Sequence, residues 1–392
     1  MAQKTERPFS TGPENGFDAR EDRPATRAAL KEWLALQAAL CLSPVRAIEC
    51  IEAAAGDPAV ALKLSRQSAR PSAAELEAWV GLLAEQEIRV LPVTSLAYPM
   101  SLRVISDPPA VLFLRGQLPD WQKPAVAIVG ARAATRYGLD IANELARNLS
   151  AAGIVVVSGL ARGIDAAAHR GALEAGSTWA VLGCGPDRVY PREHRELARN
   201  IVAAGTVLTE LPLGRPPAAP HFPLRNRIIS GLVKAVVVVE ARLRSGSLIT
   251  ARHALTQGRE VMVVPGAINS PTSAGTNALL RDGARPVLGV EDIFEALGEF
   301  DPSDKTTPSS IAQVDTPLPE DDQSIRILHA LHHESLDRDS LQRTLGLSSR
   351  ELSLRLVQLE LTGWISSDRD GRLCLARARA MVAQSTMGRG ES

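Results

Sequence analysis

Cysteine pairs, a signal sequence and long apolar runs are missing from this 392-residue sequence. The four cysteines stand far apart without a C-x-x-C pair, which argues against a structural zinc site. The polar residues 1–22 lack the apolar segment of a signal peptide, and no run of about 18 apolar residues occurs that could span a membrane. We therefore expect a cytoplasmic protein with no metal site and no membrane contact.

Aromatic residues and an excess of charge of one sign are also lacking. Aromatics make up 4% of the chain and the formal net charge is zero, which argues against a protein coated in positive charge. A local basic groove is still compatible with this total, because residues 125–260 contain 17 Lys and Arg against 10 Asp and Glu. Sixteen of these 17 cations are arginine, whose guanidinium suits phosphate recognition, so the centre of the chain favours an anionic ligand.

Composition and apolar spacing divide the chain into segments. Residues 1–24 are charged and polar and are expected to be disordered, whereas residues 25–90 have helical spacing and predict a small helical domain. Residues 301–321 are rich in Ser, Thr, Pro and Asp, as is typical of a linker. Residues 322–378 predict three helices closed by a hairpin, which is a winged-helix pattern, and residues 379–392 predict a disordered tail.

Residues 91–300 predict an α/β domain. Short apolar runs rich in β-branched residues alternate there with helical patterns, and the runs are residues 125–129, 154–157, 179–182, 206–208, 235–240 and 261–264. Continuous apolar runs are typical of strands buried on both faces of a parallel sheet. Helices between them complete βαβ units, so the expected architecture is a doubly wound sheet.

Glycines follow several of these strands directly. The first strand leads into Gly130-Ala131-Arg132 and the second into the segment from Ser158 to Gly163, which includes Gly159 and Arg162. The carboxyl ends of parallel strands line one crevice, where glycine lets backbone amides and helix N-termini approach an anion. A single loop of this kind is explained as well by a tight turn. Several at one edge, two of them with arginine, favour a phosphate site.

Motifs for nucleotide cofactors are absent. The chain has no G-x-x-x-x-G-K-[ST] segment, and no G-x-G-x-x-G follows the first strand. The second strand ends in Ser158-Gly159 instead of the acidic residue that would hold a ribose. We therefore expect no cofactor.

A second cluster lies in residues 220–229, where Phe222, Arg225, Asn226 and Arg227 precede a helical pattern. Phenylalanine offers a face on which a base can stack, and arginine forms bidentate bonds with phosphate. The alternative is that Phe222 anchors the core and the arginines are ordinary surface charges.

Signals for catalysis are weak. Asp165 and His169 are four residues apart on one predicted helix face, with Ser158 upstream, which is compatible with a nucleophile set. The interpretation that we favour is a helix-stabilising Asp–His pair beside a serine that caps backbone. Because no G-x-S-x-G elbow occurs, we expect no catalytic residue and no enzyme activity.

The ordered motifs between Tyr98 and about Ala284 resemble the bacterial DNA-processing protein A family (DprA/Smf). The matching segments are Tyr98-Pro99, Asp107-Pro108-Pro109, residues 128–132, Tyr137-Gly138, residues 157–165 with His169, Tyr190-Pro191, Phe222-Pro223, Arg225-Asn226-Arg227, Glu240-Ala241, residues 245–251, Val264-Pro265-Gly266, Gly275-Thr276-Asn277 and Gly283-Ala284.

The resemblance implies an extended Rossmann-like domain that binds single-stranded DNA without strong sequence preference. It also implies a homodimer that loads a RecA-type recombinase during natural transformation, in a family without established catalytic activity. The family's phosphate-binding G-S/T-R motif corresponds to Gly130-Ala131-Arg132, and its stacking aromatic to Phe222. The candidate phosphate contacts are Gly130, Ala131, Arg132, Ser158, Gly159, Arg162, Arg225, Asn226 and Arg227.

The terminal domains are similar to family modules, with some departures. The N-terminal helices fit a SAM-like domain without a glycine-rich hairpin, and the C-terminal segment fits the family's winged helix. Ala131 replaces the usual hydroxyl residue, and no lysine shortly precedes Phe222, so either Arg215 substitutes for it or the contact is lost. The C-terminal segment 320–379 has nine arginines against ten acids, which favours a protein contact or weak DNA contact over groove reading.

Two alternative functions remain open. Related Rossmann-like phosphoribohydrolases that act on nucleotides carry a contiguous P-G-G-x-G-T-x-x-E loop, whereas here Pro265-Gly266 and Gly275-Thr276 are separated. The other alternative is a winged-helix transcription regulator with a ligand-sensing α/β domain. The neutral third helix of the C-terminal segment argues against this regulator.

Overall fold

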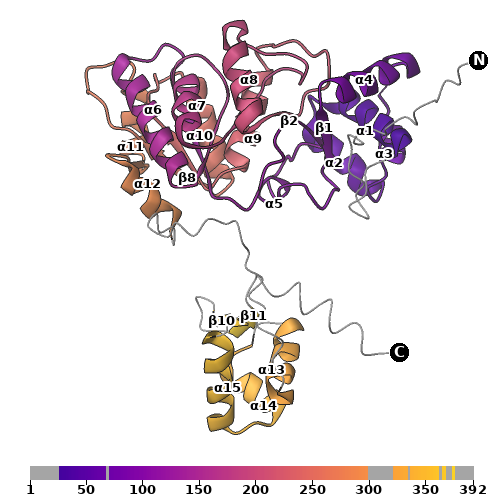
Figure 1. Cartoon of the computed structure of the whole chain (residues 1–392), viewed down its shortest axis with the longest axis vertical. Helices are drawn as coiled ribbons and strands as arrows, with labels where there is room; N and C mark the ends of the chain where they lie inside the picture. Colours follow the sequence, from indigo (N-terminus) through magenta and orange to yellow (C-terminus); the bar gives the residue numbers. More distant parts are fainter. Residues whose placement is uncertain are drawn as a thin grey trace, which may run out of the picture. The chain divides into compact units, whose positions relative to one another are not determined.

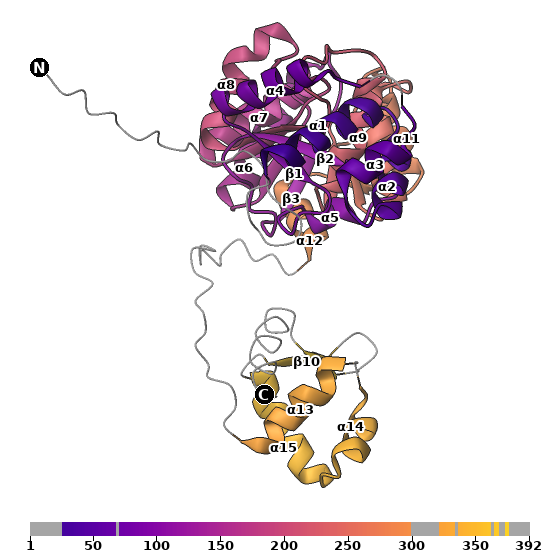
Figure 2. The same cartoon turned by 90° about the vertical axis from the view of Figure 1, so that its right-hand side faces the viewer.

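The computed structural model describes residues 26–67, 70–298, 321–333, 336–361, 364–367 and 373–375. These residues form two compact units that divide near residue 305 (Figures 1 and 2). The expected disordered ends, nearly all of the expected linker and the turn of the C-terminal hairpin lie outside the described residues. None of the helices in the described segments combines the length and apolar character needed to cross a bilayer.

The central sheet is mixed. Within the described residues it has nine strands in the order β1-β2-β6-β5-β4-β3-β7-β8-β9. Strand β2 pairs antiparallel with both β1 and β6, and all other neighbours are parallel. The bounds are β1 Ile88–Pro92, β2 Val111–Gly116, β3 Ala125–Val129, β4 Val155–Ser158, β5 Thr178–Val181, β6 Thr206–Thr209, β7 Ala235–Val238, β8 Glu260–Val263 and β9 Arg285–Pro286.

The predicted doubly wound, Rossmann-like architecture is confirmed. The six predicted strands form β3 to β8, and sequence reasoning missed β2 and β9. From β3 the chain moves along the sheet to β6, and then returns to place β7 on the other side of β3. The strand order therefore reverses between β3 and β7, which is the switch point where ligands bind in open α/β sheets.

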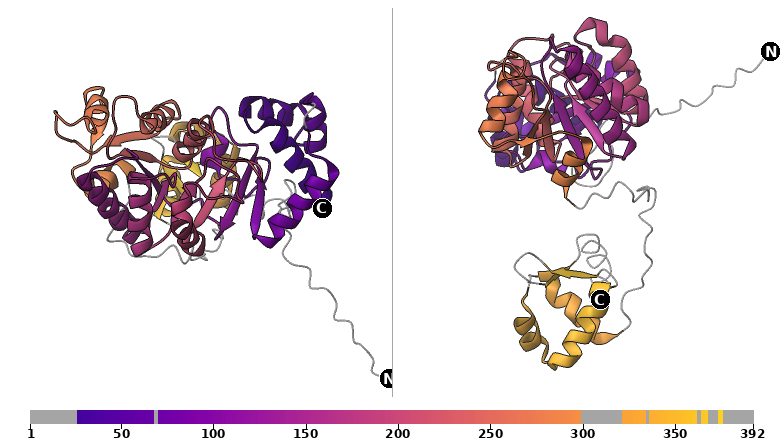
Figure 3. Two further views of the ribbon diagram at one scale, coloured as in Figure 1. Left: turned by 90° about the horizontal axis from the view of Figure 1, so that it is seen from above. Right: turned by 90° about the vertical axis from the view of Figure 1, so that its left-hand side faces the viewer.

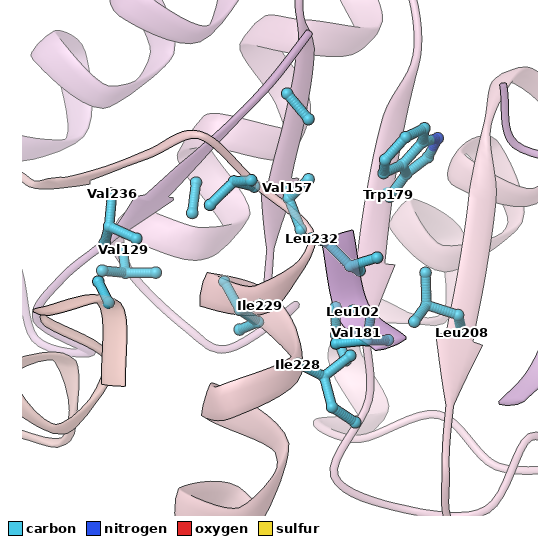
Figure 4. Packing of buried hydrophobic residues seen from close by; sticks show 14 of the residues in the cluster. Leu102, Val129, Val157, Trp179, Val181, Leu208, Ile228, Ile229, Leu232 and Val236 are labelled. Carbon is cyan, nitrogen blue, oxygen red and sulfur yellow. The ribbon is translucent and has the colours of Figure 1, made fainter. Parts of the chain in front are cut away.

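Helices cover both faces of the sheet (Figure 3). One face packs against α6 Arg136–Ala151, α7 Ile164–Ala175, α8 Arg195–Ala204 and α12 Val290–Leu297. The other packs against α5 Met100–Arg103, α9 His221–Gly231, α10 Gly246–Thr256 and α11 Ala274–Arg281. Figure 4 shows Ile228 and Ile229 of α9, and Leu232 directly after this helix, among strand residues such as Val129 and Val181.

The N-terminal helices share a core with one end of the sheet. They are α1 Arg27–Leu40, α2 Pro44–Ala53, α3 Pro58–Leu64 and α4 Ala73–Glu85. Ser72 and Glu75 form a capping box that fixes the start of α4. Leu34 and Leu83 of these helices pack with Ile88, Val90 and Phe113 of β1 and β2, so the helices lie beside this edge in Figure 1.

The C-terminal unit has the predicted winged-helix elements. Helices α13 Asp322–His333, α14 Arg338–Leu345 and α15 Ser349–Leu361 are followed by strands β10 Ile365–Ser367 and β11 Leu373–Leu375, which pair antiparallel. Its core includes Ile327, Leu341, Leu356 and Trp364. Gly346 ends α14 in the left-handed conformation at φ +66°, which glycine adopts without strain.

Candidate nucleic-acid interface

A cleft of about 720 Å³ lies at the switch point, outside the carboxyl ends of β3 and β7. Three chain segments meet around it: the loop after β3, the start of α9, and the loop after β7 with the start of α10. The lining includes Gly130, Ala131, Arg132, Asp165, Tyr190, Pro217, Phe222, Arg225, Asn226, Arg242, Arg244, Ser245, Gly246 and Ser247.

The loop after β3 is bonded to Glu240, which lies just beyond the end of β7. Gly130 and Ala131 are half-buried and Arg132 is exposed. The buried carboxylate of Glu240 accepts hydrogen bonds from the backbone N–H (2.9 Å) and the hydroxyl of Thr135, the N-cap of α6. The neighbouring β7 thus fixes the loop that carries Arg132.

The loop after β4 uses many of its polar groups internally. The Ser158 hydroxyl is buried and donates to the carbonyl of Ile128 at 2.6 Å. The backbone N–H groups of Gly159 and Ala161 donate to the carboxylate of Asp165 at 3.1 and 3.3 Å. Burial raises the pKa of Asp165, opposed mainly by the positive charge of Arg225. Ser158 therefore does not line the cleft. Its hydroxyl bonds the end of β4 to the neighbouring strand β3.

The predicted Asp–His pair is not formed, because each residue has a different partner. Asp165 binds the β4–α7 loop, whereas Nδ1 of His169 lies 2.8 Å from the hydroxyl of Thr178 on β5. Burial lowers the pKa of His169 to about 3, so this imidazole is neutral near pH 7. Ser158, Asp165 and His169 are thus held by separate structural bonds and do not assemble as a nucleophile set.

Phe222 lies on the first turn of α9 and forms part of the cleft wall. The guanidinium carbon of Arg132 lies 5.0 Å from the centroid of the Phe222 ring, which is a cation–π distance. The Tyr190 ring lies 5.7 Å from the Phe222 ring, tilted by 40°. Phe222 is thus half-buried at the cleft and does not anchor the core.

Arg225 forms part of the cleft floor. Its side chain is buried and Nη1 donates to the carbonyl of Val181 at 2.6 Å. A Cβ at Gly159 would stand 1.8 Å from the same nitrogen, so the β4 loop requires glycine at this position. Burial lowers the pKa of Arg225, and the adjacent Asp165 opposes this shift. Next to it, Asn226 donates to the carbonyl of Gly246 at 3.2 Å and joins α9 to α10.

Arg227 points away from the cleft. Its side chain is 1% exposed and forms ion pairs with Glu210 at the end of β6 and with Asp107, 3.3 Å from Nε. Burial raises the pKa of Glu210 to about 7, even though Arg227 acts in the opposite direction. Residues two apart on a helix face different directions, so Arg225 and Arg227 are separated although the sequence places them together.

Sequence reasoning missed two exposed arginines at the cleft. Arg242 and Arg244 lie in the loop between β7 and α10 and line the same cleft as the Gly130 loop. Beside them, Ser245 caps α10, and the N-terminus of this helix opens into the cleft. The rule that ligands meet the carboxyl ends of strands applies equally to the run 235–240, so this signal was available. Pro217, Ala218 and Ala219 form the wall before Phe222, whereas Arg215 is not among the lining residues.

The fold and the cleft define a Rossmann-like protein with an arginine-rimmed switch-point cleft and a winged-helix unit. The family model "DNA recombination-mediator protein A" matches residues 89–298, and the model "DprA winged helix domain" matches residues 312–371. The chain belongs to the DprA/Smf family of DNA recombination mediators.

Individual relatives agree with this assignment. Protein Smf of Escherichia coli (strain K12) is 39% identical over 305 residues, which cover 76% of this chain and 80% of the relative. The DNA processing protein DprA of Bacillus subtilis (strain 168) is 44% identical over 217 residues, covering 55% of this chain and 73% of the relative. The X-ray structure of DprA from Streptococcus pneumoniae matches with a TM-score of 0.60 at 33% identity, covering 71% of this chain and 99% of that chain. The resemblance predicted from the motifs is therefore confirmed.

Proposed function

We propose that this protein binds single-stranded DNA in the switch-point cleft, without strong sequence preference. The observation that carries the proposal is the placement of the exposed Arg132, Arg242 and Arg244 around one cleft that also contains the Phe222 ring. Arginine binds the phosphates that every nucleotide shares, and an aromatic ring stacks with any base. The site therefore has the chemistry for a DNA strand and little means of reading its sequence.

Each part of the cleft has a proposed role. The Gly130-Ala131-Arg132 loop and the N-terminus of α10 receive phosphate, and Phe222 receives a base. Arg225 and Asn226 contribute positive charge and an amide from the floor, while Gly159 and Arg162 extend the surface beyond Phe222. We leave Ser158 and Arg227 out of the proposed contacts, since both are buried and bonded to other protein groups.

Binding experiments on the whole protein test this proposal. Fluorescence anisotropy with a labelled oligothymidylate is expected to show that Arg132→Ala weakens binding about tenfold or more, because it removes a charge-assisted phosphate contact. The dependence of log K on log salt should also become shallower by about 0.7, the value for one phosphate of a single strand. Arg281→Ala is the matched control, because Arg281 is 82% exposed and does not line the cleft.

A duplex of the same sequence and a second oligonucleotide sequence complete the measurement. We expect a preference for the single strand and similar affinities for different sequences. If Arg132→Ala and the double variant Arg242→Ala/Arg244→Ala both bind as tightly as the parent protein, the cleft is not the DNA site.

We further propose that the protein acts as a cytoplasmic homodimer, formed through the Rossmann-like domain, and loads a RecA-type recombinase onto the bound strand during DNA uptake. Membership of a family of recombination mediators supports this role.

Light scattering measures the oligomeric state. Loading is tested by the rate at which a RecA-type recombinase assembles on single strands; an unchanged rate in the presence of this protein would contradict it.

For the winged-helix unit we propose a protein contact or a weak DNA contact. On the helix expected to enter a DNA groove, α15, Nε of Arg355 lies 3.6 Å from the carboxylate of Asp321, which offsets its charge. The first turn of the same helix contains Glu351, which binds Ser348 and adds negative charge. A groove-reading helix is usually basic, because its affinity depends on phosphate contacts.

We do not propose a hydrolase. The two separated halves of the candidate loop are brought together, since the Asn277 amide donates to the carbonyl of Gly266 at 3.0 Å and accepts from its N–H at 3.3 Å. An amide that is bound to backbone on both sides pins the loop. We propose this structural role for Asn277 in place of catalysis.

A further inference from the structure

Tyr190 is an aromatic residue of the interface that the proposed contacts do not yet use. Tyr190 is 42% exposed, whereas most aromatic residues in the described segments are buried or half-buried. The ring lies 5.7 Å from Phe222 and borders both the main cleft and a smaller hollow beside it. An exposed ring at the junction of two cavities is well placed to contact a ligand that extends past Phe222.

The smaller hollow lies outside the next strands of the sheet. Its lining includes Gly159 and Arg162 after β4 and Gly183 after β5. Its volume of about 30 Å³ is far too small for a base, but it admits about two water-sized groups, such as phosphate oxygens. A base would therefore lie on the exposed Tyr190 ring, with its phosphate near the hollow.

Arg162 is the cation of this hollow, and it already has a partner. Its Nε lies 2.5 Å from the carboxylate of Glu193, on the short 3₁₀ helix η1 (Arg192–His194), and both side chains are about half-exposed or more. A phosphate that approaches Arg162 meets a guanidinium that is held by a carboxylate, and it also meets the negative charge of that carboxylate. Glu193 therefore competes with phosphate for the same donor.

We propose that Tyr190 and Arg162 form a second nucleotide subsite, next to that of Phe222, for a single-stranded DNA strand. One base stacks on Tyr190 while its phosphate contacts Arg162, and Glu193 weakens this contact by holding Arg162 in the empty protein. The inference rests on the proposed function, because it extends the path of the bound DNA along the carboxyl edge of the sheet, from β3 toward β5.

Thymidine monophosphate and an oligothymidylate of about 12 nucleotides test the stacking role. The mononucleotide carries one base and occupies one platform, whereas the longer chain reaches both, within the range of known single-strand sites. For Tyr190→Leu, we expect the ratio of long-chain to mononucleotide affinity to fall about tenfold relative to the parent, the size of one lost base–aromatic stack. Tyr190→Phe should restore the ratio, because stacking needs the ring and not the hydroxyl.

These outcomes separate the subsite from a merely supporting role and from the main proposal. If Tyr190 only supported Phe222, Tyr190→Leu would weaken binding of the mononucleotide and of the longer chain equally, and the second subsite would be wrong. Phe222→Leu serves as the reference for the main cleft. If Phe222→Leu weakens binding and Tyr190→Leu does not, the second subsite fails alone; if neither variant weakens binding, the proposed function fails as well.

Charge variants test the role of Glu193. We expect Glu193→Gln to bind the long oligothymidylate about two- to fivefold more tightly, because an exposed ion pair of this kind is weak. Arg162→Ala should make the salt dependence shallower by about 0.7, and it should abolish the gain from Glu193→Gln in the double variant. Glu196→Gln, an equal charge change at an exposed position of α8, is the control. If Glu193→Gln and Glu196→Gln strengthen binding equally, Glu193 acts only through net charge and the competition is excluded.

Discussion

At the scale of residues, burial separates side chains that look alike in the sequence. Arg132 is exposed at the cleft, Arg225 is buried in its floor, and Arg227 is ion-paired on the far side of α9. Their chemistry is the same, but only an accessible guanidinium can exchange water for phosphate. The expected effects of substitution therefore differ in kind from one arginine to the next.

Arg227→Met is expected to reduce stability and leave DNA affinity nearly unchanged. Removing one partner of a buried ion pair lowers the free energy of unfolding by about 3–5 kcal/mol, since Glu210 is left without its cation. Urea unfolding measures the loss, and Glu210→Gln in the same chain should recover part of it. A stable Arg227→Met protein with DNA affinity as low as that of Arg132→Ala would contradict our assignment.

His169 is expected to make the fold sensitive to acid. Its pKa is about 3 in the folded protein and near 6.5 when exposed, so between these values the unfolded chain binds a proton that the folded protein does not. The neutral imidazole makes its full contribution to the free energy of unfolding above pH 6.5. This contribution is lost as the pH falls from 6.5 toward 3, by about 1.4 kcal/mol per pH unit at most. Urea unfolding of His169→Gln between pH 7 and pH 5 (about 2 units) should show a flatter pH dependence than the parent, and parallel curves would refute the prediction.

At the scale of elements, the shape of the cleft depends on a contact between the end of β7 and the loop that joins β3 to α6. Thr135 caps α6 by accepting from the N–H of Gly138 at 3.1 Å, and it donates to Glu240 at the end of β7. A Cβ at Gly138 would lie 2.5 Å from the Glu240 carboxyl carbon, so helix and acid are in close contact. The position of Arg132 thus depends on β7 as well as on β3.

Thr135→Val should therefore affect stability and binding together. Loss of the helix cap lowers the free energy of unfolding by about 1 kcal/mol. The looser loop should also weaken binding of oligothymidylate by a few-fold, measured by anisotropy at a temperature where the variant is folded. Thr256→Val, at an exposed position near the end of α10, is a control that removes a hydroxyl away from the cleft. Equal binding by the two variants would show that the Glu240 contact does not position Arg132.

At the scale of the whole molecule, the two ends of the chain relate differently to the sheet. Helices α1–α4 share a core with β1 and β2, and Gln37 of α1 donates to the backbone carbonyl of Glu210 at 2.5 Å. The winged-helix unit has its own core of residues such as Ile327 and Trp364. The N-terminal helices are therefore integral to the fold of the central unit, although the sequence favours a separate helical domain.

Truncation distinguishes these two relationships. We expect a chain of residues 26–305 to unfold in one cooperative transition and to bind single-stranded DNA nearly as well as the full chain. Removing residues 26–87 should instead yield an aggregating protein, because it exposes the apolar face of Ile88, Val90 and Phe113. A soluble, cooperatively folding product of the second truncation would contradict the shared core.

The sequence by itself determined strands β3 to β8, the loops at their ends and the family. Apolar runs such as 235–240 locate buried strands because a parallel sheet excludes water from both faces. The glycine after β4 is also explained locally, because Gly159 leaves room for the side chain of Arg225. Strand β2 escaped prediction because it pairs antiparallel with β1 and β6 and so stands outside the alternation of strands and helices that is typical of a parallel sheet.

Only the tertiary structure decided which side chains face the cleft. A helix turns Arg225 and Arg227 in different directions, and burial then commits Arg227 to Glu210. Tyr190 meets Phe222, and Arg162 meets Glu193, although the two residues of each pair are separated by about 30 residues along the chain and follow different strands. Residue types are local information, whereas exposure and pairing arise from packing among distant segments.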